Sequence, residues 1–160
     1  MLPPAALKYV LFALEGTPQV LASLLHNTPA DSPLWDLRPD PERFTIREVL
    51  AHMADWEEIF HGRILRMVAE ANPSLPDIDE GEMAIKNNYG EIDPLASLAR
   101  MTIGRATLIA TLRNLTPEQW QRVALREKLG SLNIEQQAVL ILGHDGYHTH
   151  QVARYLKSGG

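Results

Sequence analysis

The stretch from Thr45 to Ala71 reads TIREVLAHMADWEEIFHGRILRMVAEA. Its apolar residues recur every three or four positions, which is the spacing of one helix face: Val49, Met53, Trp56, Phe60, Ile64 and Met67. Thr45 and Glu48 have the spacing of a capping box, and Asn72-Pro73 follows as a stop signal. The stretch therefore predicts one long amphipathic helix, which needs partners to bury its apolar face.

Three further stretches carry the same kind of signal. The first runs from Pro4 to His26, with a break or kink expected at Thr17-Pro18 because proline lacks an N–H and crowds the preceding turn. Another begins at the N-cap Asp93, followed by proline, and reaches about Asn114. The last begins at Asn133, with Gln136 reaching back to it, and runs to Lys157.

The remaining segments are expected to connect these helices. Thr116-Pro117-Glu118 predicts one short helix, and residues 72–93 are expected to be irregular and to shape the mouth of a pocket. No segment shows the alternation typical of a β-strand. The sequence thus predicts an all-α protein, a four-helix bundle formed as a single domain by residues 1–160.

Composition excludes several functions. The 160 residues include no cysteine, which rules out disulfides, thiolate zinc sites, iron–sulfur clusters and a cysteine nucleophile. The net charge is −5 and no basic run is present, so nucleic-acid binding is not expected. Apolar runs such as Tyr9–Leu14 are far below the roughly 20 residues that span a bilayer. With no recognisable signal peptide, a cytoplasmic location is the default expectation.

Two histidines, His144 and His148, stand one helical turn apart in the last predicted helix. Both imidazoles then lie on one face and can reach the same ion. Gln151 and Tyr155 fall within roughly 20° of His144 around the helix and extend a polar stripe there. A pair with this spacing also arises by chance, in which case the histidines are half-buried and bonded to ordinary partners.

The second helix offers His52 and His61 as a third ligand. Each lies about 90° from the centre of its apolar face, on opposite sides, so periodicity does not choose between them. A histidine that is not a ligand is expected at the helix edge, and for His61 the expected partner is Glu57 or Glu58.

A rival interpretation is a di-iron carboxylate site. Glu58 precedes His61, and Asp145 precedes His148, by the three residues found in such bundles. Those sites also need a carboxylate from each remaining helix, and Leu95–Leu115 contains no acidic residue. The ligand count therefore disfavours this interpretation.

Two motifs carry a resemblance to a known family. Residues 44–57 read FTIREVLAHMADWE, and residues 144–152 read HDGYHTHQV. In this order they resemble the DinB-like (DinB/YfiT) superfamily, whose members are regarded as metalloenzymes, and the similarity extends over essentially the whole chain. The resemblance implies a bundle with long crossover connections and one divalent metal ion, with His52, His144 and His148 as ligands. Gln151 matches the family pattern, whereas Thr149 and His150 depart from it.

The resemblance also sets expectations for function. Three neutral imidazoles leave coordination positions open to water or substrate, and they suit Zn or Ni, with Fe or Mn as further candidates. Because the superfamily includes mycothiol- and bacillithiol-dependent enzymes, it implies a small-molecule substrate, a hydrolase or a low-molecular-weight-thiol S-transferase, and a homodimer. The alternative is a non-catalytic stress-response bundle that binds metal or a small ligand.

Residues near these histidines are candidates for supporting roles. Asp55 lies one turn after His52 and is the candidate catalytic residue, as an acceptor that orients an imidazole or as a base. The alternative for Asp55 is a solvated acid on the helix surface. Trp56, Gln151 and Tyr155 are candidates for the pocket wall or for contacts behind the ligands, with ordinary core packing as the alternative for Trp56.

Overall fold

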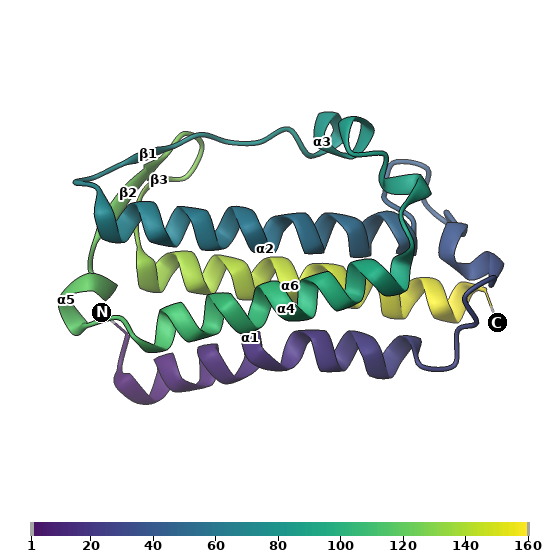
Figure 1. The fold of residues 1–160 in the computed structure, drawn as a ribbon, viewed down its shortest axis with the longest axis horizontal. Helices are drawn as coiled ribbons and strands as arrows, with labels where there is room; N and C mark the ends of the chain where they lie inside the picture. Colours follow the sequence, from purple (N-terminus) through teal and green to yellow (C-terminus); the bar gives the residue numbers. More distant parts are fainter. Residues whose placement is uncertain (1, 160) are drawn as a thin grey trace.

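A computed structural model describes residues 2–159, and four long helices form its body. They are α1 (Pro4–Leu25), α2 (Ile46–Ala69), α4 (Pro94–Arg113) and α6 (Ile134–Ser158). Helices α1 and α6 run in one direction along the bundle, and α2 and α4 run in the other (Figure 1). Helix α2 packs against α4 and α6, and α1 packs against the same two helices. The predicted four-helix bundle is confirmed.

The helices begin where their capping residues predict. The Thr45 hydroxyl accepts from the Glu48 backbone N–H at 3.2 Å, and the Glu48 carboxylate accepts from the Thr45 N–H at 2.8 Å. Asn133 forms the equivalent capping box at the start of α6, and the Asp93 carboxylate caps α4. One expectation is wrong in part, because α1 continues without a break through Pro18.

The connection from α2 to α4 runs the length of the bundle. Because these neighbouring helices are parallel, residues 70–93 must return from one end to the other, and they cross above α2 (Figure 1). This crossover contains β1 (Ser74–Leu75), α3 (Glu80–Lys86) and the 3₁₀ helix η2 (Tyr89–Glu91). The expectation of an irregular segment is therefore wrong for much of it, since Asp79 caps a regular two-turn helix.

A small sheet lies at the end of the bundle where α2 ends (Figure 1). Strand β1 pairs in parallel with β2 (Val123–Arg126), which pairs antiparallel with β3 (Gly130–Asn133). The expectation that the chain has no strand is wrong, because strands of two to four residues are too short to show alternation. Short helical segments complete the fold: η1 (Pro33–Asp36) and α5 (Pro117–Trp120).

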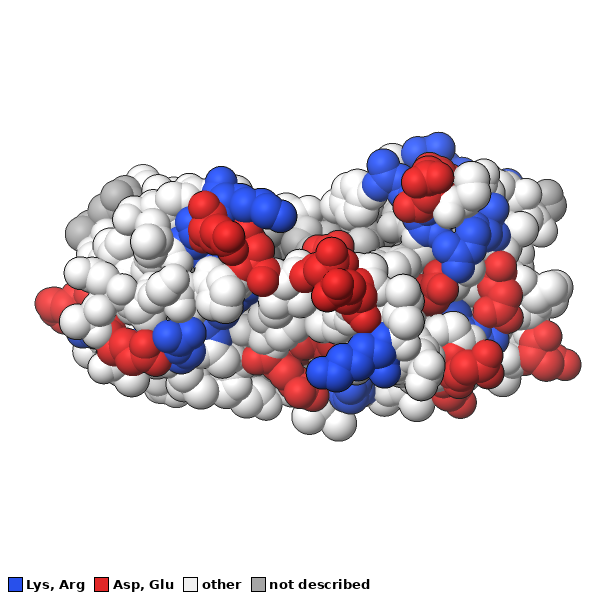
Figure 2. All heavy atoms as spheres, turned by 90° about the horizontal axis from the view of Figure 1, so that it is seen from above, with Lys and Arg blue, Asp and Glu red and all other residues white. Residues whose placement is uncertain are grey.

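Helix α2 is buried on most of its circumference, which places its polar residues inside the molecule. Side chains buried there include His52, Glu57 and Arg63 as well as Trp56. On the crossover side, acidic and basic side chains are interspersed over the surface (Figure 2). Within residues 2–159, no helix combines the length and the apolar character needed to cross a lipid bilayer.

Candidate metal centre

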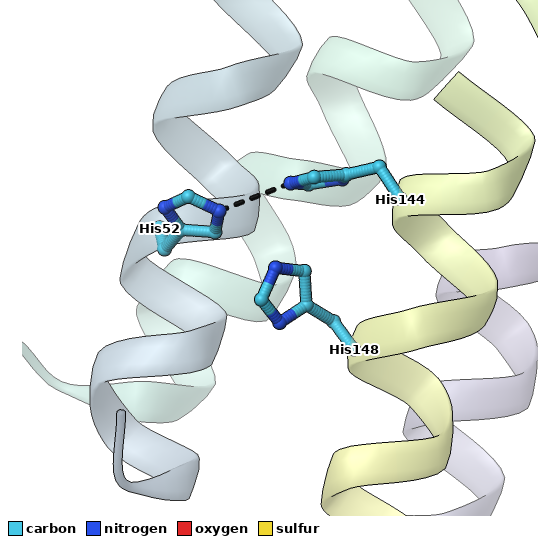
Figure 3. Close-up of side chains that lie close together, drawn as sticks. All are labelled: His52, His144 and His148. Carbon is cyan, nitrogen blue, oxygen red and sulfur yellow. Dashed lines mark hydrogen bonds between the residues drawn. The ribbon is translucent and has the colours of Figure 1, made fainter. Parts of the chain in front are cut away.

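Three histidines from two helices meet in the interior. His52 projects from α2, and His144 and His148 project from α6, so that their rings point toward one another (Figure 3). One ring nitrogen from each lies within 4.8 Å of the others, and the Nε2 atoms of His52 and His144 are 3.0 Å apart. His52 is fully buried, His148 is buried and His144 is half-buried. The structure thus brings together the three histidines that the resemblance names.

Gln151 determines which nitrogen of His148 faces the cluster. The Gln151 amide nitrogen donates to the Phe44 carbonyl at 2.8 Å and to the Tyr155 hydroxyl at 3.3 Å. Its carbonyl oxygen is therefore the atom that faces His148 Nδ1, at 3.2 Å. This arrangement makes Nδ1 the protonated nitrogen and leaves the lone pair of Nε2 free to bind an ion. Tyr155 is buried behind Gln151 and is not exposed to the cavity described below.

Aromatic rings enclose the cluster on its inner side. The Trp56 ring lies 5.8 Å from that of His52 and 5.5 Å from that of His144, measured between centroids. Phe60 approaches His144 edge-on at 5.3 Å, and Phe44 lies 5.3 Å from His52. Trp56 therefore belongs both to the hydrophobic core and to the wall of the site.

A buried network of charged side chains adjoins His144, and no sequence motif predicts how its members pair. Arg105 on α4 donates to Glu57 on α2 and to Asp145 on α6, and each of these side chains is 2% exposed. The Thr17 hydroxyl donates to the same Asp145 carboxylate at 2.8 Å. Asp145 Oδ1 in turn lies 3.9 Å from His144 Nδ1. Arg105 Nη1 also donates to the Leu14 carbonyl of α1 at 2.6 Å, so one arginine links all four long helices directly behind a candidate ligand.

The environment shifts the pKa values of this network. Burial raises the pKa of Glu57, and its bonds to Arg105 offset this only in part. Burial also acts to raise the pKa of Asp145, but His144, Arg105 and Thr17 outweigh it and hold that pKa below its ordinary value. The pKa of Arg105 is raised, because the two carboxylates outweigh its burial.

The buried histidines are held in their neutral form. Burial, followed by the neighbouring imidazoles of His148 and His144, lowers the pKa of His52 to about 2. Burial and His144 likewise lower the pKa of His148 to about 4, against a bond to Gln151 that acts to raise it. Neutral imidazole is the form that ligates a metal ion.

An open cavity of about 550 Å³ gives access to the cluster. His144 and His148 form part of its wall, together with Tyr147, Gln151 and the segment from Glu42 to Phe44. Glu80 and Gly81 of the crossover line the other side, as expected for a segment that shapes the pocket mouth. The cluster is therefore reachable by a small molecule.

Two hydrogen bonds expected of neighbouring residues are not made among residues 2–159. Asp55 makes no hydrogen bond to a cluster histidine among residues 2–159: its carboxylate accepts from Asn87 at 2.7 Å, from the Tyr89 hydroxyl at 2.9 Å and from Arg100. Asp55 is about 60° from His52 around α2, which turns it toward the crossover and α4. His61 pairs with the Thr111 hydroxyl at 2.9 Å, not with Glu57 or Glu58, and it lies outside the histidine cluster.

The cluster fits a divalent metal ion. Nitrogen ligands at about 2.1 Å in a tetrahedral arrangement stand about 3.4 Å apart, which lies between the 3.0 Å that separates His52 from His144 and the 4.8 Å within which all three nitrogens fall. The three donors are all imidazoles, two of them are buried and one is half-buried, and the two buried ones are held neutral by their surroundings. The buried Nδ1 atoms of His52 and His144 have no hydrogen-bond partner among the described residues. No hydrogen bond at Nδ1 therefore opposes a ring orientation in which Nε2 binds an ion.

The fold and the site together define a class: four-helix-bundle proteins with a three-histidine cluster suited to one divalent metal ion. The DinB superfamily matches residues 13–152, and the chain belongs to this family. YfiT from Bacillus subtilis, described as a probable metal-dependent hydrolase with an unusual four-helix bundle topology, superposes with a TM-score of 0.91. The two chains are 20% identical, and the match covers 100% of this chain and 91% of YfiT. No curated protein matches the chain.

Proposed function

We propose that this protein is a metal-dependent hydrolase acting on a small molecule, with His52, His144 and His148 as the ligands of one divalent ion. The observation that carries the proposal is the convergence of three imidazoles, two of which line an open cavity. Three protein ligands leave a coordination position for a reacting group, which is the arrangement of catalytic and not structural sites. An ion bound there supplies Lewis acidity and activates water.

The chain's own residues supply positioning and access. Gln151 holds His148 with Nε2 toward the site, and Arg105 holds Asp145 beside His144. Trp56 and Phe60 exclude water from the inner side of the cluster, so that a substrate approaches only from the cavity. Ionic interactions are stronger in such a partly desolvated site than in water.

The proposal is tested first by metal content. Protein purified without an affinity tag or chelator, then loaded separately with Zn, Ni, Mn and Fe, is analysed by plasma mass spectrometry after gel filtration. We expect near-stoichiometric metal in the wild type and its loss in His52→Ala and His144→Ala. His61→Ala is the matched control, because it removes a half-buried histidine of α2 outside the cluster. Absence of metal from the wild type, or metal retained in both cluster variants, overturns the proposal.

Turnover then separates the candidate reactions. The loaded protein is assayed on ester and amide panels, and in parallel on electrophiles with low-molecular-weight thiols. Hydrolysis lost in His144→Ala supports the proposal. Activity in the thiol panel alone identifies an S-transferase, and stoichiometric metal with no turnover in either panel identifies a non-catalytic binding protein. Either of these two results overturns the hydrolase assignment.

A further inference from the structure

A second group of polar side chains lies at the crossover, and all of its members except the half-buried Asp77 are buried. It consists of Arg63 on α2, Asp77 in the crossover, Arg126 on β2 and Gln137 on α6, called here the Arg63 cluster. Arg63 is 6% exposed, Arg126 8% and Gln137 1%. Side chains of this polarity are seldom buried to this degree unless they have partners.

Hydrogen bonds hold the members of the Arg63 cluster side by side. Arg63 Nη2 donates to the Pro76 carbonyl at 2.9 Å, and Arg126 Nη2 donates to the adjacent Asp77 carboxylate at 3.0 Å. Arg126 Nη1 also donates to Gln137 Oε1 at 3.3 Å. Because residues 76 and 77 are neighbours in the chain, the two guanidinium groups lie close together.

Each member of the cluster also has one polar atom without a hydrogen-bond partner among residues 2–159. These atoms are the donors Arg63 Nη1, Arg126 Nε and Gln137 Nε2, and the acceptor Asp77 Oδ2. The orientation of the Gln137 amide is fixed, since its oxygen accepts from Arg126. An unpaired polar atom in a buried place destabilises the fold, and more so when its group is charged, so the three unpaired donors together indicate a missing acceptor.

The charges in the cluster do not balance. Two guanidinium groups face one carboxylate, which leaves a surplus positive charge in a buried place. Burial, with Arg126 nearby, lowers the pKa of Arg63 to about 10, which agrees with an incompletely compensated charge. A bound water would leave this charge unneutralised, whereas a small anion would both accept from the three unpaired donors and neutralise the charge.

We propose that the Arg63 cluster binds one small monocarboxylate. Guanidinium groups match the planar carboxylate with paired hydrogen bonds, and the Gln137 amide supplies a further donor. A dianion such as phosphate is disfavoured, because Asp77 already contributes one negative charge and one unpaired acceptor oxygen. The proposal does not rest on metal binding or on hydrolysis.

The Arg63 cluster lies on the same faces of α2 and α6 as the three histidines. His52, Trp56 and Arg63 fall within about 40° of one another around α2, as do Gln137 and the two α6 histidines around α6. The Arg63 guanidinium carbon lies 5.1 Å from the centroid of the Trp56 ring, which also contacts the rings of His52 and His144. The Trp56 Nε1 atom also lacks a partner among the described residues. Trp56 therefore contacts both the Arg63 cluster and the candidate metal centre.

The test uses metal-free protein and acetate as the probe. Thermal unfolding and titration calorimetry are run in sodium acetate, sodium chloride and sodium phosphate at equal ionic strength. We expect a saturable rise in Tm with acetate that exceeds the rise with the other two salts. Arg63→Met should abolish this difference, whereas Arg113→Met, which removes an exposed arginine paired with Glu15, should retain it.

A second variant keeps the test conclusive if Arg63→Met does not fold. Gln137→Leu removes one donor and leaves both guanidinium groups, and it should weaken acetate binding about tenfold or more. The proposal is overturned if wild type responds to acetate as it does to chloride, or if Gln137→Leu binds acetate as tightly as wild type. A crystal structure grown in acetate that holds only waters at the four unpaired atoms would also overturn it.

Discussion

Gly104→Ala is expected to force α2 and α4 apart. A Cβ atom at Gly104 would lie 2.6 Å from Glu57 Cβ and 3.1 Å from Glu57 Cγ. Carbon atoms pack about 3.5–4.0 Å apart, so the helices would have to separate by about 1 Å. Rotating the Glu57 side chain does not relieve the contact, because its Cβ is fixed to the backbone and its carboxylate is bound to Arg105.

The expected change in the free energy of unfolding of Gly104→Ala is the sum of two opposing effects. Overpacking a buried site costs typically 1–3 kcal/mol, and a rigid contact of this kind falls near about 3 kcal/mol. Alanine gains about 1 kcal/mol over glycine in a helix interior, which leaves a net loss of about 2 kcal/mol. For a domain of this size, that corresponds to a Tm lower by about 4–8 °C.

Gly62→Ala on α2 is the matched control, since nothing lies within 4 Å of its added Cβ. It should stabilise the protein by up to about 1 kcal/mol through helix propensity alone. Urea unfolding followed by circular dichroism at 222 nm measures both variants. Their difference of about 3 kcal/mol isolates the contact with Glu57, because the propensity gain cancels. Equal stability of the two variants would refute the close packing of α2 on α4 at this residue.

Three further predictions concern the buried polar groups. Arg105→Met should cost about 3–5 kcal/mol in urea unfolding, because it leaves two buried carboxylates without their cation; a loss below 1 kcal/mol would contradict this. Metal-free protein should lose stability as the pH falls from about 6.5 toward 4, because His52 and His148 have lowered pKa values only when folded, so the unfolded chain binds more protons. His148→Gln should reduce the dependence of Tm on pH, and an unchanged dependence would contradict this prediction. Asp55→Asn should speed amide hydrogen exchange in residues 80–93, with no change expected in residues 134–158 as the internal control.

The parts of the fold that the sequence predicts are those specified by local chemistry. Capping boxes such as Thr45–Glu48 act within one turn, so they place helix starts without knowledge of the tertiary structure. The i, i+4 spacing of His144 and His148 is equally local, and the structure keeps both rings on one face. Residue spacing does not identify whether His52 or His61 is the third candidate ligand, because this depends on which face of α2 is turned toward α6.

The features that the sequence did not predict depend on long-range partners. Arg105 is separated from Glu57 by 48 residues and from Asp145 by 40, and nothing local marks the three as a unit. Strand β1 exists only because β2 supplies its hydrogen bonds from another part of the chain. Asp55 was expected to bond to an imidazole because it lies one turn after His52; the sequence does not show that the crossover provides two of its three partners instead.

The parallel arrangement of α2 and α4 explains why the site lies where it does. It requires a full-length crossover, and that crossover lies above α2 with Glu80 and Gly81 at the cavity that reaches the histidines (Figure 1). Helix α2 holds the crossover near both ends, through Asp55 on Asn87 and Tyr89 and through Arg63 on the Pro76 carbonyl. The same helix carries His52, so the position of the cavity wall and the position of a candidate ligand are set by one rigid element. Sequence changes in the crossover can therefore alter which molecules enter without displacing the three histidines, which is how one bundle can serve different substrates.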